Sequence, residues 1–270
     1  MDKDTKIGII FASLTDTEYV EKSIEPWLQI KQEKPENLII CAVSAFFKEY
    51  NQNIPEEQTT RPYLRGLLKD KKIDYLIDGP DGLLLEHELR NIALQFLLNN
   101  HKLDYIFIVD GDEFYSVDGI KKITRYITLD EFVVWYKVHY KNILFNGDVY
   151  TNGFAPPRIF KVKVGDLLLS RCYWDNDMIY KKALSDKTFE EVAYTKLPSQ
   201  KIPDSIHRPL HYTWLNNERS RDKIQYQKKR GWLCSYEWDY KNNQLIFNKE
   251  FFVKNNLIIP QTFSLEESSY

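Results

Sequence analysis

Four short apolar segments, each followed by a helix-like segment or a turn, constrain the fold of this chain most strongly. The apolar segments are residues 6–13, 37–46, 73–78 and 105–110. Continuous apolar runs without alternation are typical of strands buried on both faces of a parallel sheet. Residues 16–32 and 83–101 have helical apolar spacing. This order predicts an α/β fold with a Rossmann-like, mostly parallel sheet flanked by helices.

The second half of the chain is less regular. Residues 131–145 alternate apolar and polar side chains, as an exposed or edge strand does. Residues 198–209 contain three prolines and no apolar period, which predicts a loop. Residues 216–231 have helical spacing between an Asn cap and a terminal glycine. We expect one main domain over residues 1–212, and a C-terminal helical extension over 213–270 packed on that same domain.

The composition is that of an ordinary globular protein. The 270 residues can bury one sizeable core, and the content of 43% apolar and 28% charged residues is typical of that class. The net charge of −2 gives no overall field toward nucleic acid or anionic lipid. The three cysteines lie far apart, so neither a disulfide framework nor a zinc site is expected. With no signal peptide or membrane-length apolar stretch, we expect a cytoplasmic protein.

An acidic turn follows the fourth apolar segment. Asp110, Asp112 and Glu113 lie within four positions, where the predicted buried strand ends. Carboxylates so close repel one another and lose hydration, so we expect a positive partner there. Ligands of open parallel sheets bind beyond the carboxyl ends of the strands. The turn therefore lies where a ligand is expected.

Four interpretations of this turn were open. A solvated turn needs no partner, since Asp and Gly are ordinary turn residues. An EF-hand loop is excluded, because its fifth and sixth positions would be Phe114 and Tyr115. A phosphohydrolase would use Asp110 as its nucleophile and Asp112 as acid or base, although such enzymes usually place this strand near the chain start. A divalent-metal site for a diphosphate needs such hard oxygen ligands, and Gly111 would let the backbone approach the ligand.

The sequence YIFIVDGDEF (105–114), preceded by HELRNIAL (87–94), resembles the Asp-x-Asp region of GT-A-fold glycosyltransferases, in particular the family-2-like group. PPRIF (156–160) resembles a strand that often follows this region, and HYTW (211–214) resembles the segment with the C-terminal metal-binding histidine. The resemblance covers roughly residues 6–215. It implies a GT-A fold and a metal-dependent transfer of a sugar from a nucleotide-sugar, most simply a UDP-sugar, to a hydroxyl acceptor.

The resemblance also implies roles for particular residues. Asp110, Asp112 and His211 would hold Mn²⁺ or Mg²⁺, with Asp112 as the stronger direct ligand. An imidazole ligand favours Mn²⁺. Asp110 and Gly111 would also contact the nucleotide, and Arg90 would brace the turn or a phosphate.

Recognition of the nucleobase is less well defined. The second strand of that family often ends in an Asp-rich turn, whereas this chain has Ser44 there. We expect the nucleotide to contact the end of the first strand, at Ala12, Ser13 and Leu14, or Asp78.

An inverting transfer needs a base for the acceptor proton, and a retaining one does not. Asp175 and Asp177 are the candidate bases, with Trp174 as a candidate sugar platform; a polar turn is the alternative. The acceptor would be a glycan, a lipid-linked sugar or another hydroxyl compound, and a nucleic acid is less favoured. The competing functions are a nucleotide-sugar-binding module without turnover and the phosphohydrolase.

Overall fold

The computed structural model describes residues 5–48, 54–144, 149–150, 155–173, 177–184, 188–214, 221, 224–225, 228, 236–242 and 244–254. The chain divides into two compact units. The first comprises Met1–His139 and Ala155–Pro209, and the second comprises Tyr140–Phe154 and Leu210–Tyr270. The second unit thus combines an internal segment with the C-terminal part of the chain.

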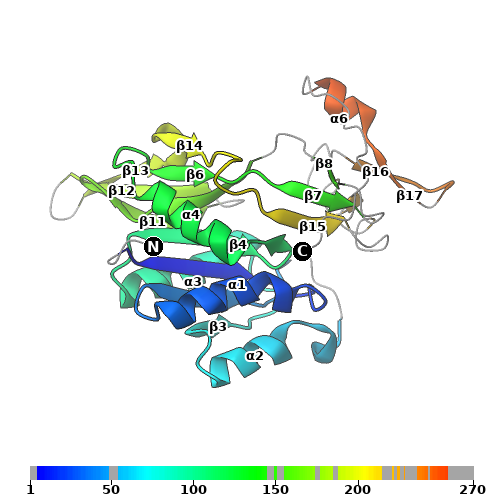
Figure 1. Ribbon diagram of the computed structural model, residues 1–270, viewed down its shortest axis with the longest axis horizontal. Coiled ribbons are helices and arrows are strands. Elements are labelled where there is room, and N and C mark those ends of the chain that lie inside the picture. The colour runs from blue at the N-terminus through cyan, green and yellow to red at the C-terminus, as the bar shows by residue number, and fades with distance from the viewer. Residues whose placement is uncertain are drawn as a thin grey trace. The chain divides into compact units, whose positions relative to one another are not determined.

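A seven-stranded sheet forms the centre of the first unit, with the strand order β14-β6-β9-β4-β1-β2-β3 (Figure 1). The strands β1 to β4 are parallel neighbours, whereas β9 is antiparallel to both β4 and β6. This confirms the predicted α/β class with a mostly parallel sheet. The bounds are β1 (Ile7–Ala12), β2 (Leu38–Val43), β3 (Tyr75–Ile77), β4 (Tyr105–Asp110), β6 (Trp135–Lys137), β9 (Pro157–Lys161) and β14 (Ser199–Lys201).

The four parallel strands end at the same level. Ala12 at the end of β1 is in register with Val43 of β2 and with Asp110 of β4. Val43 is in turn in register with Ile77 of β3. The residues that follow these strands therefore share one edge of the sheet, and ligands of open α/β sheets bind at that edge.

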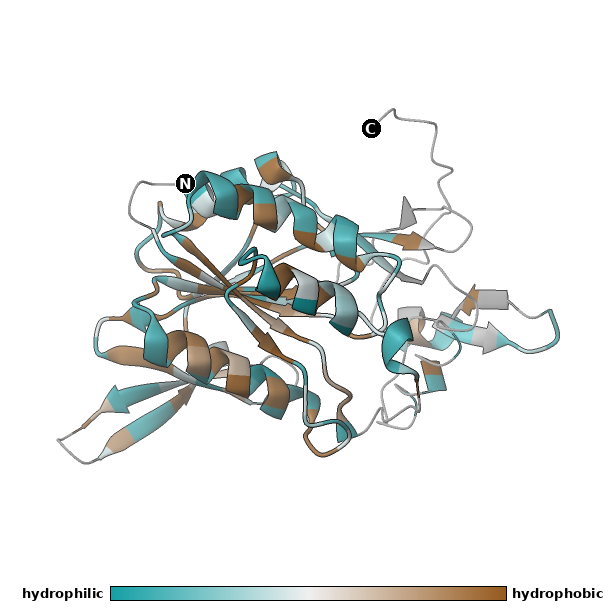
Figure 2. Ribbon diagram, turned by 90° about the horizontal axis from the view of Figure 1, so that it is seen from below, coloured by the Kyte–Doolittle hydropathy of each residue, from teal (hydrophilic) through white to brown (hydrophobic). Residues whose placement is uncertain are grey.

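Helices cover the sheet because their apolar side chains recur at helical spacing. In α3, the buried residues Leu89, Ala93 and Leu97 follow one another at four-residue intervals, and the helix packs against β1, β2 and β11. Figure 2 shows the apolar strands in the interior of this unit, with helices outside them. The helix bounds are α1 (Val20–Glu33), α2 (Arg61–Lys69), α3 (Glu86–Asn100) and α4 (Val117–Ile127), with short 3₁₀ turns η2 (Glu56–Gln58) and η3 (Tyr194–Lys196).

A four-stranded antiparallel sheet, which the sequence did not predict, packs on α3 through β11. Its buried residues Leu169, Cys172 and Tyr180 belong to the same core as the inner face of α3. The Tyr180 hydroxyl donates to the Lys161 carbonyl at 2.6 Å, which joins this sheet to the end of β9. The bounds are β10 (Lys163–Val164), β11 (Leu167–Tyr173), β12 (Asp177–Ala183) and β13 (Phe189–Ala193).

The prediction of a loop over residues 198–209 is partly wrong, because strand β14 lies within this segment. This strand pairs with β6, and its three side chains are exposed, so it has no apolar pattern to reveal it. The next residue, Ile202, donates its N–H to the Lys137 carbonyl at 2.9 Å. Backbone pairing, rather than apolar burial along the strand, holds this edge.

In the second unit, β15 runs parallel to β7, and β7 is antiparallel to β8. The expected C-terminal helical extension is wrong in part, because a β16–β17 hairpin precedes the short helix α6. Most of the helix predicted over 216–231 lies outside the described residues. The bounds are β7 (Lys141–Leu144), β8 (Val149–Tyr150), β15 (Leu210–Trp214), β16 (Tyr236–Asp239), β17 (Gln244–Phe247) and α6 (Lys249–Lys254), and the two-residue β5 (Glu113–Phe114) follows the acidic turn in the first unit.

The described helices include none that is both long and apolar enough to cross a membrane.

Gly119 and Gly66 make a matched pair of helical glycines. A Cβ at Gly119 in α4 would overlap the imidazole of His207, whereas one at Gly66 in α2 would meet nothing within 4 Å. We predict that Gly119→Ala lowers the unfolding free energy by about 1–3 kcal/mol through overpacking. Gly66→Ala should raise it by about 0.5–1 kcal/mol through helix propensity. Urea unfolding of both variants measures the two changes in unfolding free energy. Changes of the same sign in the two variants would contradict the packing seen at Gly119.

Candidate functional site

The acidic turn lies where the order of the parallel strands reverses. From β1 the chain continues to β2 and β3 on one side, and then crosses to β4 on the other side of β1. Such a switch point is the usual ligand site of an open α/β sheet. Gly111, just after β4, donates its N–H to the Ala12 carbonyl at 2.7 Å, so the ends of these two strands stay joined.

Gly111 is packed against the loop that follows β1. A Cβ on Gly111 would lie 2.7 Å from the Cβ of Ser13 and 2.9 Å from Oδ2 of Asp16. The sequence suggested that this glycine lets the backbone approach a ligand. The structure supplies a reason within the protein itself, since only glycine lets the turn approach Ser13 and Asp16 this closely.

Two buried arginines hold the acidic turn. Asp110 Oδ1 accepts a hydrogen bond from Arg90 Nη2 at 2.7 Å, and Asp110 Oδ2 accepts one from Arg158 Nη2, also at 2.7 Å. Arg158 also donates from Nε to Glu113 Oε1 at 3.0 Å, and Arg90 pairs with Glu86 at 2.8 Å. We call these five residues the arginine–carboxylate cluster.

Burial makes this pairing strong. Arg90 is 6% exposed, Arg158 5% and Glu113 0%. Burial acts to lower the pKa of Arg90, but the carboxylates of Glu86 and Asp110 more than offset it, so the pKa is raised and the guanidinium stays charged. Charges removed from water to this extent are stable only when they are paired and hydrogen-bonded.

The expected positive partner is therefore present, but for Asp110 and Glu113 it is arginine. This corrects the expectation that a metal ion supplies the charge for the whole cluster. Asp112 is 6% exposed and belongs to the same turn. The guanidinium groups of Arg90 and Arg158 pair with the carboxylates of Glu86, Asp110 and Glu113 in this cluster. Within the described part of the chain, no group of three or more His, Cys, Asp or Glu side chains forms a ready metal site.

Sequence reasoning missed Arg158. The segment PPRIF was recognised only as a strand that resembles one in the family, and its arginine received no role. The available signal was a charged residue beside Ile159 and Phe160, both 0% exposed. Arginine within a buried strand usually has an ionic partner. The sequence could not identify its partners, because Glu113 and Asp110 lie 45 and 48 positions away.

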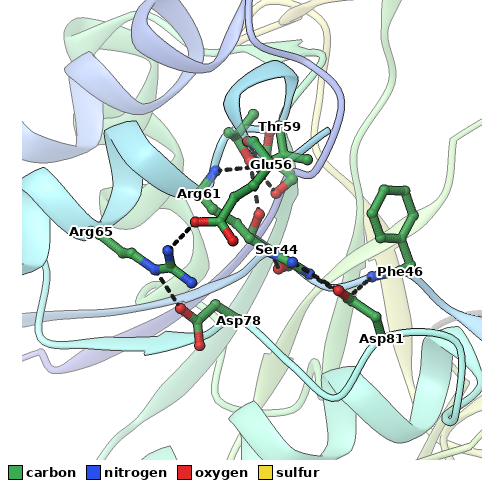
Figure 3. A network of polar contacts seen from close by, with 10 residues as sticks. Ser44, Phe46, Glu56, Thr59, Arg61, Arg65, Asp78 and Asp81 are labelled. Atoms are coloured by element: carbon green, nitrogen blue, oxygen red, sulfur yellow. Dashed lines mark hydrogen bonds and ion pairs between the residues drawn. The ribbon is translucent and has the colours of Figure 1, made fainter. Parts of the chain in front are cut away.

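A second polar network lies at the ends of β2 and β3 (Figure 3). The buried Arg61 donates from Nε to the Ser44 carbonyl and from Nη1 to Asp81 Oδ2, both at 2.8 Å, and also bonds Asp81 Oδ1. Asp81 Oδ1 accepts the N–H of Phe46 at 2.9 Å. The family's second strand often ends in an acidic turn, which this chain lacks. Here Asp81 brings a carboxylate to that place from the loop after β3.

The loop after β1 is tied to this network through Thr60. The Thr60 hydroxyl donates to the Ser13 carbonyl at 2.7 Å and lies 3.0 Å from the Ser44 hydroxyl. The Thr60 N–H donates to the Leu14 carbonyl at 2.8 Å. The structure thus brings Ala12 and Ser13 to the end of β4 through Gly111, and it joins Ser13 and Leu14 to Thr60.

Asp78 lies at the end of β3, as predicted, but it is engaged by an arginine. Its Oδ2 accepts from Arg65 Nε at 2.8 Å, and Arg65 also pairs with Glu56 (Figure 3). Arg65 and Asp78 are 45% and 37% exposed. An ion pair this exposed contributes little to stability, so a ligand could displace it at small cost.

His211 belongs to the second unit. Its Nδ1 lies 2.8 Å from Asn142 Oδ1. A carbonyl oxygen only accepts, so this hydrogen bond uses a hydrogen on Nδ1. A metal-ligating histidine commonly donates one ring N–H to such an acceptor and binds the metal through the other nitrogen. His207, four residues earlier in the chain, packs against Gly119 and against the ring of Tyr115 at 5.8 Å in the first unit.

The candidate bases stay predictions. Asp175 and Trp174 lie outside the described residues, and so does the side chain of Asp177 at the start of β12.

No protein-family model matches this chain, and no curated protein does. Similar solved structures include S. aureus TarS 1-349, with 11% identity over 83% of this chain and 64% of that one, at a TM-score of 0.43. The mannosyltransferase PcManGT from Pyrobaculum calidifontis, in complex with GDP-Man and Mn²⁺, has 11% identity over 85% of this chain and 65% of that one, at a TM-score of 0.47. TarS 1-349 in complex with UDP-GlcNAc has 12% identity over 74% of this chain and 59% of that one, at a TM-score of 0.39.

This chain spans less than two thirds of each of those three structures. With identities of 11–12% and TM-scores below 0.5, the likeness carries no conclusion about activity.

Removing Arg158 should leave the carboxylate of Glu113 buried without its cation. We predict that Arg158→Ala lowers the unfolding free energy by about 3–5 kcal/mol. The matched control is Arg65→Ala, whose ion pairs are exposed and should cost less than about 1 kcal/mol. Adding Glu113→Gln to Arg158→Ala should restore part of the loss. Urea unfolding measures all three, and similar losses for the two arginines would contradict a buried cluster.

Asp81 should make stability depend on pH. Partial burial acts to raise its pKa, but the hydrogen bonds from Arg61 and Phe46 and the charge of Arg61 lower the pKa overall. A lowered folded-state pKa gives stability that is present above the unfolded pKa of about 4 and is lost as the pH falls through the folded value. Asp81→Asn should therefore destabilise the protein at pH 7, and the difference from the parent should shrink below about pH 4. Unfolding free energies from pH 7 to 3 test this, with Asp166→Asn as an exposed control expected to change little.

Proposed function

We propose that this protein is a glycosyltransferase that uses a nucleotide-sugar, most simply a UDP-sugar, and transfers the sugar to a hydroxyl acceptor. The observation that carries the proposal is an Asp-x-Asp turn at the carboxyl end of β4, at the switch point beside β1. The Arg-Asn helix named in the sequence resemblance supplies Arg90, which contacts that turn at Asp110. Ser13, Leu14 and Gly111 line the same switch point and are the proposed nucleotide contacts.

A divalent cation fits the turn in a restricted way. Mg²⁺ or Mn²⁺ bound with a diphosphate commonly uses only one or two carboxylates, so a single carboxylate of the turn is enough to hold it. Both oxygens of Asp110 accept from arginines, so Asp112 is the proposed direct ligand. The role of His211 as a metal ligand stays a prediction from the resemblance. When bound, the ion would act as a Lewis acid on the leaving nucleoside diphosphate.

The role proposed for Asp110 is to position the turn. Its two hydrogen bonds at 2.7 Å fix the carboxylate between α3 and β9 before any ligand arrives. Because the turn is already ordered by the protein, less of the binding free energy is lost in ordering it when the ligand binds. Asp78 is the proposed contact for the nucleobase, because its exposed pair with Arg65 can open.

The cluster counts against the phosphohydrolase. That mechanism needs an oxygen of Asp110 to attack phosphorus. In this structure each oxygen accepts a charge-assisted hydrogen bond from a buried guanidinium, which lowers its nucleophilicity. A binding module without turnover has the same site, and only an activity measurement separates it from the transferase.

Nucleotide binding is tested by thermal shift with UDP and GDP, with and without Mn²⁺. At a hundredfold excess over Kd, we predict about 2.7 kcal/mol of stabilisation that requires the metal. Asp112→Asn should abolish the metal-dependent shift. Asp110→Asn should lower the melting temperature even without ligand, because it weakens the cluster. Asp118→Asn, 73% exposed on α4, is the control expected to change neither value.

Each alternative has its own outcome. No stabilisation by any nucleoside diphosphate would sink the proposal. Stabilisation without hydrolysis or transfer of a sugar would favour the binding module. Phosphate release from a phosphomonoester, lost in Asp110→Asn, would favour the phosphohydrolase.

A further inference from the structure

An exposed aromatic ring lies near the arginine–carboxylate cluster. Tyr173, the last residue of β11, is 51% exposed, and its ring centroid lies 6.2 Å from that of His87. His87 is in the first turn of α3, three residues before Arg90, so the two side chains share one face of the helix. Arg90 in turn reaches Asp110.

The end of β11 is fixed to α3. Cys172 donates its N–H to Asn91 Oδ1 at 3.2 Å, and the Cys172 side chain is buried beside the helix. Cys172 also lies close enough to Arg90 to affect its pKa. The position of Tyr173 is therefore fixed relative to α3, the helix whose Arg90 contacts the acidic turn.

An ion pair lies beside Tyr173 among the described side chains. The guanidinium of Arg171 lies 5.4 Å from the centroid of the Tyr173 ring, and it pairs with Glu191 at 2.8 Å. An aromatic face beside hydrogen-bonding groups suits a pyranose ring, whose C–H face is apolar and whose hydroxyls need polar partners. An anionic lipid or nucleic acid would require an excess of positive charge, which a balanced ion pair does not provide.

We propose that Tyr173, together with His87 and Arg171, binds a pyranose ring of a neutral acceptor glycan. The ring stacks on Tyr173, and its hydroxyls bond to Arg171 and Glu191. This inference rests on the proposed function, because it assigns the side from which the acceptor approaches. It differs from the sequence prediction, which considered Trp174 as the sugar platform.

Phe189 offers a matched control on the same sheet. It is 55% exposed and has Lys181 over its ring, so it too is an exposed aromatic beside a cation. It pairs with Ala183, whereas Tyr173 pairs with Asp177 six residues earlier on β12. At about 3.3 Å per residue, the two rings are separated by roughly 20 Å along the strand. Phe189 is thus comparable in chemistry but remote from α3.

The test measures binding of neutral saccharides to the full chain by saturation-transfer NMR. The probes are methyl glucoside, methyl mannoside and N-acetylglucosamine, each titrated with and without UDP and Mn²⁺. Tyr173→Ala should weaken binding of the preferred probe at least tenfold, and Tyr173→Phe should keep it within about threefold. Phe189→Ala should leave it unchanged, and urea unfolding confirms that each variant is folded.

Four outcomes would overturn the proposed sugar-binding role of Tyr173. They are no saccharide binding by the parent chain, equal affinity in Tyr173→Ala, equal loss in Phe189→Ala, and a preference for the 6-phosphates of the same sugars. The proposed function fails separately, when nucleoside diphosphates give no stabilisation. In a transfer assay, Tyr173→Ala should raise the KM for the glycan acceptor at least tenfold.

Discussion

The buried contact of Arg158 with Asp110 and Glu113 is the interaction on which the rest of the site depends. It joins β9 to the turn after β4, two elements that are remote in sequence but adjacent in the sheet. Arg90 completes it from α3. Arg90, Arg158 and Glu113 are almost fully removed from water, whereas the side chain of Asp110 is 26% exposed. The buried charges are stable there only because they are paired. The acidic turn is therefore held from two separate parts of the fold, β9 and α3.

The level ends of β1 to β4 make the other half of the site. Backbone bonds and close packing join these ends, through Gly111 to Ala12 and Ser13, and through Thr60 to Ser13 and Leu14. Asp81 supplies, from a neighbouring loop, a carboxylate near the end of β2 where the chain itself has Ser44. These contacts join the ends of neighbouring strands, an arrangement that suits a ligand that must be positioned for reaction.

Helix α3 connects the two sides that we propose. One turn of it carries His87 toward Tyr173, and the next carries Arg90 toward Asp110. The antiparallel β10–β13 sheet matters for the same reason, since β11 packs on this helix and presents Tyr173. On this interpretation the parallel sheet serves the donor and the antiparallel sheet serves the acceptor.

The sequence by itself determined the parallel core, because strands such as 105–110 are continuous apolar runs and α3 has a clear helical period. It also placed Asp110 and Asp112 at a strand end. It did not reveal β14, whose side chains are exposed, or the β11–β12 pairing, which depends on contacts with α3. Only the tertiary structure decided the partners of Asp110. An ion pair between residues 20 or 48 positions apart leaves no periodic signal, since it forms only when the sheet brings those side chains together.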